Sequence, residues 1–278
     1  MSNRENTSGN KSILLLTGSQ GFIGRYLKQK IGISNLILPV RNKKNDYEIS
    51  YNECFNYRPN FIIHCAANPN TKYNNETYNV FNENIDLTYT LLEKFDNLHF
   101  LHLSTILIYD NYATKSIGPK TIYGTGKYTS ELLCNNFQRI KNIKVTNLRI
   151  PATVGPGLTH GFIYDLIQKI KNTTNGEILL FGKQPGSYKP FIHVDDVYKK
   201  IVKVFDNKMY GSFDIGPDDN LSVEEIAKIA MQHLNKEVKI NWTGESWPGD
   251  DNVILYKSNF LASNTSKEAI SLAIGENI

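Results

Sequence analysis

The sequence has few of the features that mark membrane or secreted proteins. No apolar run approaches the roughly 18 residues needed to cross a bilayer, and the longest runs, Ile13–Leu16 and Asn35–Val40, are strand-sized. The first ten residues are polar and lack the apolar core and cleavage site of a signal peptide. These absences exclude a membrane-spanning protein, and they predict a cytoplasmic protein without a membrane partner whose residues 1–10 are disordered.

Cysteines, metal-ligand pairs and basic runs are also scarce. Cys54, Cys65 and Cys134 form no CxxC pair and share no ligand spacing with a histidine, so we expect reduced thiols and no metal. The formal net charge is only +4 over 278 residues, without a basic run of the kind that binds nucleic acid. With 40% hydrophobic and 21% charged residues, the composition is that of an ordinary globular protein.

Short apolar runs alternate with helical patterns along the first 150 residues. The apolar runs lie at 12–17, 35–40, 60–65, 99–104 and 143–149, and the helical patterns at 22–31, 78–95 and 123–139. Strand–helix–strand units repeated this often require right-handed crossovers and a parallel sheet covered on both faces. We therefore predict an α/β fold in which residues 11–150 form a doubly wound Rossmann domain with a parallel sheet.

The pattern changes after Pro151, where proline and glycine become frequent. Helical stretches are expected at 161–171 and 194–205, strands at 177–181 and 212–215, and a further helix after Ser222, which forms a capping box with Glu225. The last forty or so residues show little periodicity. We expect 151–278 to be mainly a smaller C-terminal substrate-binding lobe over the carboxyl edge of the sheet, with about 191–216 returning to the larger domain.

A glycine-rich turn joins the first predicted strand to the first predicted helix. Glycines at this place allow a tight turn, close approach of backbone N–H groups to a pyrophosphate, and close packing of helix on strand. We therefore predict a dinucleotide site that includes Gly18, Gln20, Gly21, Phe22, Ile23 and Gly24.

The end of the second predicted strand bears on which dinucleotide binds. Val40 occupies the place where NAD-preferring sites carry an acid for the ribose hydroxyl, and Arg41, which follows it, can accept a 2′-phosphate. We favour NADP(H) over NAD(H) on this basis. The alternative is that Arg41 and the nearby lysines form a solvated loop.

Tyr123 and Lys127 are four residues apart, so a helix places both on one face. An ammonium group near a phenol favours its ionised form, and such a pair can exchange a proton with a substrate oxygen. Thr105 ends a predicted central strand, where its hydroxyl can share that oxygen.

Taken in order, these motifs resemble those of the extended short-chain dehydrogenase/reductase family, in its NAD(P)-dependent nucleotide-sugar epimerase, dehydratase and reductase branch. The matching segments are Thr17–Gly24, Ile63–Ala67, Asn84, Leu103–Thr105 before Tyr109, Tyr123 with Lys127 and Glu131, Leu148–Pro151, Gly155–Gly157, Phe191–Asp196, Phe213–Gly216 and Leu221–Ser222. The resemblance implies that Thr105, Tyr123 and Lys127 are the catalytic residues. It further implies that Tyr123, Lys127, Ala66 and Pro151 contact the cofactor.

The departures from the family pattern narrow the expected chemistry. In sugar 4,6-dehydratases of the family an Asp and a Glu follow the catalytic Thr, whereas this chain has Ile106 and Leu107, which cannot transfer protons. Lys189 stands where the family has an arginine for the substrate diphosphate, so we predict that Lys189, with Thr105, binds substrate. The connection from Thr105 to Tyr123 is shorter than in most epimerases and is similar in length to that of 4-keto sugar reductases.

Three functions follow as hypotheses. The favoured one is NADPH-dependent reduction, at C4, of a nucleoside-diphosphate 4-keto-6-deoxyhexose in deoxysugar biosynthesis for surface polysaccharide. The second is an NAD-dependent nucleotide-sugar 4-epimerase, and the third is a non-catalytic NADP-binding regulator. Asn84 is open to two interpretations, a hydrogen-bond relay or a link between helix and strand. We also expect a homodimer, because paired helices form the dimer interface in related enzymes.

Overall fold

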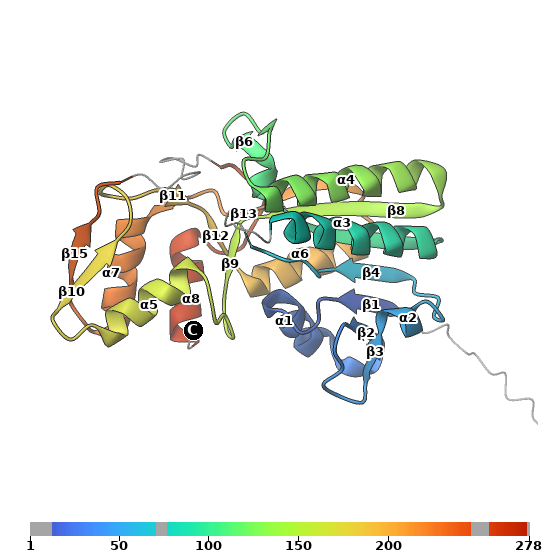
Figure 1. Cartoon of the computed structure of the whole chain (residues 1–278), viewed down its shortest axis with the longest axis horizontal. Coiled ribbons are helices and arrows are strands. Elements are labelled where there is room, and N and C mark those ends of the chain that lie inside the picture. Colours follow the sequence, from blue (N-terminus) through green and yellow to red (C-terminus); the bar gives the residue numbers. More distant parts are fainter. Residues whose placement is uncertain (1–12, 71–76, 246–255, 277–278) are drawn as a thin grey trace, which may run out of the picture.

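The structure is a computed structural model that describes residues 13–70, 77–245 and 256–276. The predicted disorder of residues 1–10 falls outside these ranges. Figure 1 shows a larger part built around one sheet and a smaller part that contains α5, α7 and α8.

The larger part is built on a parallel sheet of eight strands in the order β16-β13-β8-β5-β4-β1-β2-β3. Its strands are β1 (Leu14–Thr17), β2 (Leu36–Val40), β3 (Glu48–Ser50), β4 (Phe61–His64), β5 (Leu98–Thr105), β8 (Ile143–Ile150), β13 (Gly211–Gly216) and β16 (Phe260–Leu261). The α/β fold with a large parallel sheet is therefore confirmed. The strand order reverses at β1, because β2 and β3 follow on one side of it and β4 and β5 on the other. Ligands of such sheets bind at the carboxyl ends of the strands near this point.

Helices cover both faces of this sheet. They are α1 (Phe22–Ile31), the short α2 (Tyr51–Cys54), α3 (Thr77–Lys94), α4 (Ile122–Ile140) and α6 (Val194–Asp206), with 3₁₀ turns η1 (Ile33–Asn35) and η2 (Ile106–Ile108). Leu16 packs in the core shared with α1 and α6, whereas its neighbour Leu15 packs in the core shared with α3 and α4. Burial on both faces explains why the strands are continuous apolar runs.

The smaller part has its own hydrophobic core. It comprises α5 (Phe162–Asn172), α7 (Val223–Leu234), α8 (Ser266–Gly275) and the paired strands β10 (Glu177–Leu180) and β15 (Lys239–Trp242). Short pairs connect it to the rest: β9 (Ala152–Val154) with β12 (Phe191–His193), and β11 (Tyr188–Lys189) with β14 (Leu221–Ser222). The predicted capping box of Ser222 and Glu225 is confirmed at the start of α7.

The C-terminal segment is more ordered than its weak periodicity suggests. A second capping box, Thr265 with Glu268, opens α8, and β16 joins the large sheet beside β13. In the described residues no helix is both long and apolar enough to span a bilayer. The division of the chain near residue 150 stays a prediction.

Candidate active site

The glycine turn has the geometry of a pyrophosphate cradle. Gly18 has a φ of +70°, and a Cβ there would lie 2.6 Å from the backbone nitrogen of Ala66. A Cβ on Gly24 would lie 2.1 Å from the Gly18 oxygen, so only glycine lets α1 approach the turn this closely. No side chain caps α1, and its first turn has no acid, so its positive end remains open to an anion.

One more observation supports the fit of a dinucleotide here. The Ser19 hydroxyl is buried in the turn without a hydrogen-bond partner among the described residues. Buried polar groups are normally paired, so an unpaired one inside a glycine turn is typical of a ligand site. Gln20, Phe22 and Ile23 lie in or directly after this turn, and Ala66 faces it from the end of β4.

The loop after β2 is organised by a carboxylate that sequence reasoning missed. Glu48 is only 2% exposed and accepts hydrogen bonds from the backbone nitrogen atoms of Lys44 and Asn45 at 2.6 and 3.1 Å. Gln20 Nε2 also donates to Glu48 Oε1 at 3.1 Å. Although burial opposes it, these bonds hold the pKa of Glu48 below its usual value. Glu48 therefore shapes the loop that carries Arg41.

Arg41 lies at the end of β2 as predicted, with two-thirds of its side chain exposed. Its guanidinium forms an ion pair with Glu83 of α3, with 3.4 Å between Nη2 and Oε2 and exposed side-chain fractions of 67% and 36%. Exposed pairs of this kind contribute little stability and are readily exchanged for a better partner. Arg41 can therefore turn toward an anion bound beside β2.

Thr105 and Tyr123 come from adjacent segments at the carboxyl edge of the sheet. Thr105 ends β5 and accepts a hydrogen bond from the Leu107 nitrogen at 3.2 Å, so its own O–H remains a donor. Thr121 caps α4, whose first turn packs against η2 so closely that a Cβ on Gly124 would lie 2.4 Å from the Leu107 oxygen. Tyr123 precedes Gly124, so the close packing of Gly124 against Leu107 fixes where Tyr123 lies relative to η2.

The electrostatics of Tyr123 and Lys127 differ from the expectation. Burial raises the pKa of Tyr123 to about 12, whereas a nearby ammonium would lower it. The Lys127 ammonium is directed elsewhere: it lies 2.7 Å from His102 Nε2, and the lysine is 2% exposed. Burial lowers the pKa of Lys127 to about 8. Sequence reasoning did not single out His102, although its place on an apolar strand three residues before Thr105 was a signal.

His102 belongs to a polar row that crosses five neighbouring strands at one level. The row consists of Thr17, His64, His102, Asn147 and Ser212, each paired in register with the next. Hydrogen bonds and one ring stack join its members: Thr17 to His64 at 2.8 Å, His64 to His102 at 5.7 Å between ring centroids, His102 to Asn147 at 3.2 Å, and Asn147 to Ser212 at 3.2 Å.

Asn84 has a structural role. Its amide nitrogen donates to the Val80 and Asn68 oxygen atoms at 2.9 and 3.0 Å, and its oxygen accepts from the Asn68 nitrogen at 2.8 Å. These bonds hold the segment after β4 against α3. They favour the second interpretation of Asn84, a link between helix and strand.

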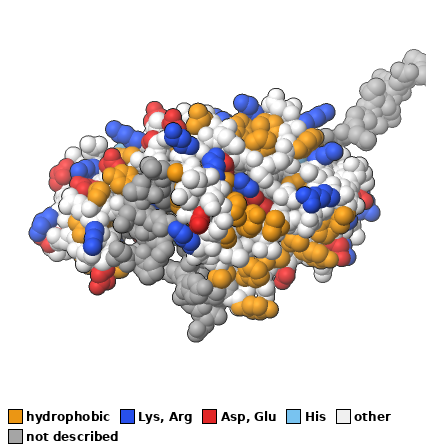
Figure 2. Space-filling view, turned by 90° about the horizontal axis from the view of Figure 1, so that it is seen from above, with side chains coloured by type: hydrophobic (Ala, Val, Ile, Leu, Met, Phe, Trp, Pro, Cys, Tyr) orange, Lys and Arg blue, Asp and Glu red, His pale blue; other side chains and the backbone are white. Residues whose placement is uncertain are grey.

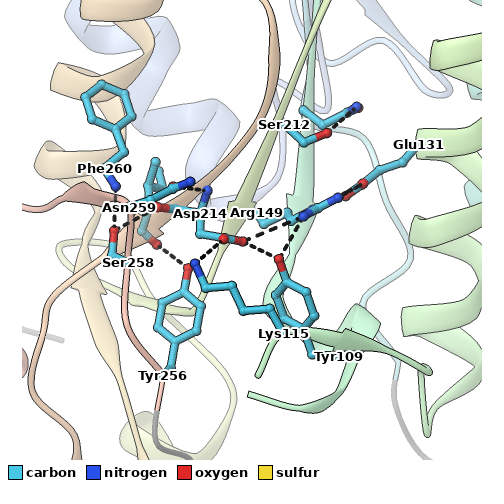
Figure 3. Close-up of polar contacts among 12 residues, drawn as sticks. Tyr109, Lys115, Glu131, Arg149, Ser212, Asp214, Tyr256, Ser258, Asn259 and Phe260 are labelled. Atoms are coloured by element: carbon cyan, nitrogen blue, oxygen red, sulfur yellow. Dashed lines mark hydrogen bonds and ion pairs between the residues drawn. The ribbon is translucent and has the colours of Figure 1, made fainter. Parts of the chain in front are cut away.

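A buried polar cluster supports the connection between Thr105 and Tyr123 (Figure 3). This connection forms a hairpin of β6 (Tyr109–Asn111) and β7 (Ser116–Ile117). The Tyr109 hydroxyl accepts from Arg149 at 2.7 Å and donates to Asp214 at 2.6 Å, and Lys115 binds the other Asp214 oxygen at 2.6 Å. Arg149 in turn holds Glu131 of α4 through several bonds, the shortest 2.7 Å. The cluster therefore ties the hairpin to β8, β13 and α4.

Lys189 lines a cleft of the smaller part. The cleft has a volume of about 770 Å³. Its walls include Phe162, Asp165, Gln168, Phe181, Ser187 and Lys189. Aromatic walls with a few polar groups and two cations, since Lys169 also lines the cleft, are suited to a base joined to a phosphate. Pro151 lies directly after β8, beside Gly216 of β13, where a Cβ would be 3.2 Å from its ring.

The cysteines form no disulfide, as the sequence predicts. All three cysteines are free, and burial raises the pKa values of Cys54 and Cys65 to about 12. Across residues 13–70, 77–245 and 256–276, no cluster of three or more His, Cys, Asp or Glu side chains could hold a metal ion.

The sequence is similar to those of a known protein family and of several known proteins. A sequence model of the NAD dependent epimerase/dehydratase family matches residues 14–216. UDP-glucuronic acid decarboxylase 1 of Arabidopsis thaliana is 24% identical over 267 residues, which cover 82% of this chain and 60% of that protein. The chain thus spans about three fifths of the length of this plant relative. CDP-abequose synthase of Yersinia pseudotuberculosis is 25% identical over 290 residues, which cover 94% of this chain and 99% of that protein.

Solved structures show the same fold. A UDP-glucose 4-epimerase from Thermotoga maritima, determined with UDP-glucose, aligns with a TM-score of 0.79 over 95% of this chain and 97% of that chain. The two sequences are 20% identical. At this identity the likeness establishes a shared architecture.

Proposed function

The chain belongs to the NAD dependent epimerase/dehydratase family, and we propose that within it the protein is an NADPH-dependent reductase of a nucleoside-diphosphate 4-keto-6-deoxyhexose. The observation that carries the proposal is the combination of Thr105, Tyr123 and Lys127 with the apolar Ile106 and Leu107. Ile106 is 4% exposed and forms η2 with Leu107, so this turn contains no side chain that could remove water from a sugar. A ketone reduction needs only the first three residues.

The state of Tyr123 suits the reductive direction. Burial raises the pKa of Tyr123 to about 12, so the phenol keeps its proton at neutral pH. A bound nicotinamide cofactor would supply the hydride. Tyr123 then donates its proton to the oxygen at C4, while the Thr105 hydroxyl donates a hydrogen bond to the same oxygen. Both groups stabilise negative charge on oxygen where it develops, which is the main work of such a site.

Other residues bind the ligands. The turn from Gly18 to Gly24 would hold the cofactor pyrophosphate, and Arg41 the 2′-phosphate that distinguishes NADPH from NADH. Lys127 would bind the nicotinamide ribose, with Ala66 and Pro151 beside the cofactor. Lys189 would pair with the substrate diphosphate as a point charge, and the 770 Å³ cleft beside it would take the base.

The similarity to CDP-abequose synthase supports a deoxysugar substrate, since the two chains align over nearly their whole lengths. The proposal includes a role in deoxysugar biosynthesis for surface polysaccharide. It also includes the cytoplasm as location, in agreement with three free cysteines.

A homodimer formed through α3 and α4 is part of the proposal. Figure 2 shows hydrophobic side chains gathered over the half of the molecule where Figure 1 places these helices. Tyr89 of α3 and Leu132 of α4 are each 45% exposed, and Tyr78 of α3 and Ile140 of α4 are 74% exposed. Exposed apolar patches of this kind mark interaction surfaces. Leu132→Asp is expected to give a monomer in sedimentation equilibrium.

The function is tested by nicotinamide absorbance with NADPH or NADH and a panel of dTDP-, CDP-, GDP- and UDP-linked 4-keto-6-deoxyhexoses. We expect rapid NADPH oxidation with one of them, and a loss of about 10²–10⁴-fold in kcat for Tyr123→Phe. Activity of Tyr123→Phe near that of the wild type would contradict the assigned proton donor.

A 4-epimerase is the second candidate, favoured by the likeness in fold to a UDP-glucose 4-epimerase. An epimerase must take back the hydride it removes and therefore retains its cofactor through the reaction. NAD released on denaturing the purified protein, together with no oxidation of NADPH by any sugar in the panel, would favour the epimerase.

A further inference from the structure

The surroundings of the catalytic lysine contain one unusual partner. Lys127 is 2% exposed, and its ammonium lies 2.7 Å from the Nε2 atom of His102, which is fully buried. A buried ammonium is costly unless it is hydrogen-bonded. The carboxylate one turn further along α4, Glu131, is bound by Arg149 at both of its oxygen atoms, at 3.1 and 2.7 Å. His102 is therefore the hydrogen-bond acceptor for the Lys127 ammonium.

The hydrogen bonds of His102 define which of its nitrogen atoms carries the proton. Asn147 donates through Nδ2 to Ser212 at 3.2 Å, so its Oδ1 faces His102 Nδ1 at 3.2 Å. An amide oxygen only accepts, so Nδ1 carries the hydrogen and Nε2 presents a lone pair. The lone pair faces the three N–H donors of the ammonium.

Other groups keep His102 neutral. His64 stacks on it with ring planes 24° apart and is held by Thr17 and Thr88 at 2.8 and 2.9 Å. Burial lowers the pKa of His64 to about 3 and that of His102 well below its usual value. Three titratable groups act on the pKa of Lys127 through their charge: Cys65, Cys134 and Glu131. Lys127 in turn lowers the pKa values of His64 and His102. Neither imidazole competes with the lysine for a proton.

We propose that His102 is a positioning residue for Lys127, whose Nε2 lone pair keeps the lysine charged and directs its ammonium into the sheet until the cofactor binds. The proposal rests on the proposed function only in that Lys127 is the catalytic lysine. His102 does not pass protons, because Asn147 has no proton to supply to Nδ1. Its effect is to set the pH range in which Lys127 is an ammonium.

The proposal predicts opposite effects of two substitutions on the pKa of Lys127. His102→Leu removes the acceptor, and loss of a hydrogen bond to a charged group corresponds to a fall of about 1–2 pH units. Asn147→Asp places a carboxylate behind Nδ1, strengthens Nε2 as an acceptor and raises the pKa of Lys127. His102→Gln keeps an oxygen acceptor and should stay within about half a pH unit of the wild type.

The experiment is an NMR titration of lysine side chains labelled with ¹³C at Cε in the cofactor-free protein, with Lys127 assigned from Lys127→Arg. A lower Lys127 pKa in His102→Leu, with the wild-type value in His102→Gln, would support the proposal. The same pKa in His102→Leu and wild type would overturn it. Circular dichroism checks folding, and if His102→Leu does not fold, a Lys127 pKa in Asn147→Asp that is unchanged or lower overturns the proposal.

The titration separates this proposal from the proposed function, because it needs no substrate. A shifted Lys127 pKa in a protein that reduces no sugar would leave the role of His102 intact and refute the reductase. Where turnover is found, the alkaline limb of the kcat/KM profile should move to lower pH in His102→Leu and be restored in His102→Gln.

Discussion

Replacing Arg149 with methionine should destabilise the protein severely. Glu131 is 1% exposed and Arg149 17%, with 2.7 Å between Nη2 and Oε2. Methionine fills much of the same space but leaves the Glu131 carboxylate buried without its donors. Removing one partner of a buried pair costs about 3–5 kcal/mol, a large part of the roughly 5–15 kcal/mol that stabilises a typical domain.

Differential scanning fluorimetry measures this loss. At about 2–4 °C per kcal/mol for a chain of this size class, Arg149→Met should lower Tm by on the order of 10 °C. Lys228→Ala is the control, because Lys228 is 61% exposed and pairs with Glu224 one turn away on α7. That pair is worth about 0.3–0.5 kcal/mol, so Tm should change by less than about 2 °C.

The double variant Glu131→Leu/Arg149→Met removes both charges and should recover part of the loss, because apolar replacements of a buried pair are tolerated. A Tm for Arg149→Met within about 2 °C of the wild type would refute the reasoning. It would mean that water or another cation reaches Glu131.

Three further changes probe other parts of the molecule. Gly24→Ala places a methyl group 2.1 Å from the Gly18 oxygen and should abolish NADPH binding in a fluorescence titration, whereas Gly275→Ala, with open space around it, should not. Arg41→Ala should weaken NADPH binding about 10–100-fold and leave NADH unchanged; equal effects on both would contradict a 2′-phosphate contact. Burial lowers the pKa of His99 to about 4, so the unfolded state takes up its proton first and stability falls as pH drops from about 6.5 toward 4. His99→Gln should make the fall in the free energy of unfolding, measured by urea denaturation, less steep by up to about 1.4 kcal/mol per pH unit, and an unchanged slope would show that His99 is not neutral in the folded state.

Local signals in the sequence were sufficient for much of the fold. Apolar runs buried on both faces predicted the central strands, and the pattern over Phe22–Ile31 predicted α1 with the bounds that the structure has. Capping boxes were equally informative: the one at Ser222 predicted α7, and the same signal at Thr265 would have found α8. Where periodicity is weak, a cap remains a local and readable feature.

The site was only partly predictable, because its decisive contacts join residues far apart in the chain. Lys127 meets His102 across 25 positions, and Lys115 meets Asp214 across 99, through the order of strands rather than through any motif. The pKa of Tyr123 is raised by burial, where the spacing to Lys127 predicted a lower value, for a related reason. Spacing places two side chains on one helix face, but burial and the nearest acceptor decide where an ammonium points.

The polar row from Thr17 to Ser212 also bears on how this sheet finds its pairing. Side chains alternate between faces along a strand, so a slip of one residue in any of the five strands would turn its polar member into the apolar core on the other side. Each slipped arrangement would bury an unpaired hydroxyl, amide or imidazole, whereas uniformly apolar strands would tolerate the error. The polar row beside Lys127 thus favours one alignment of these strands over alignments shifted by a residue, and a substitution in one strand changes which polar groups its neighbours can pair with.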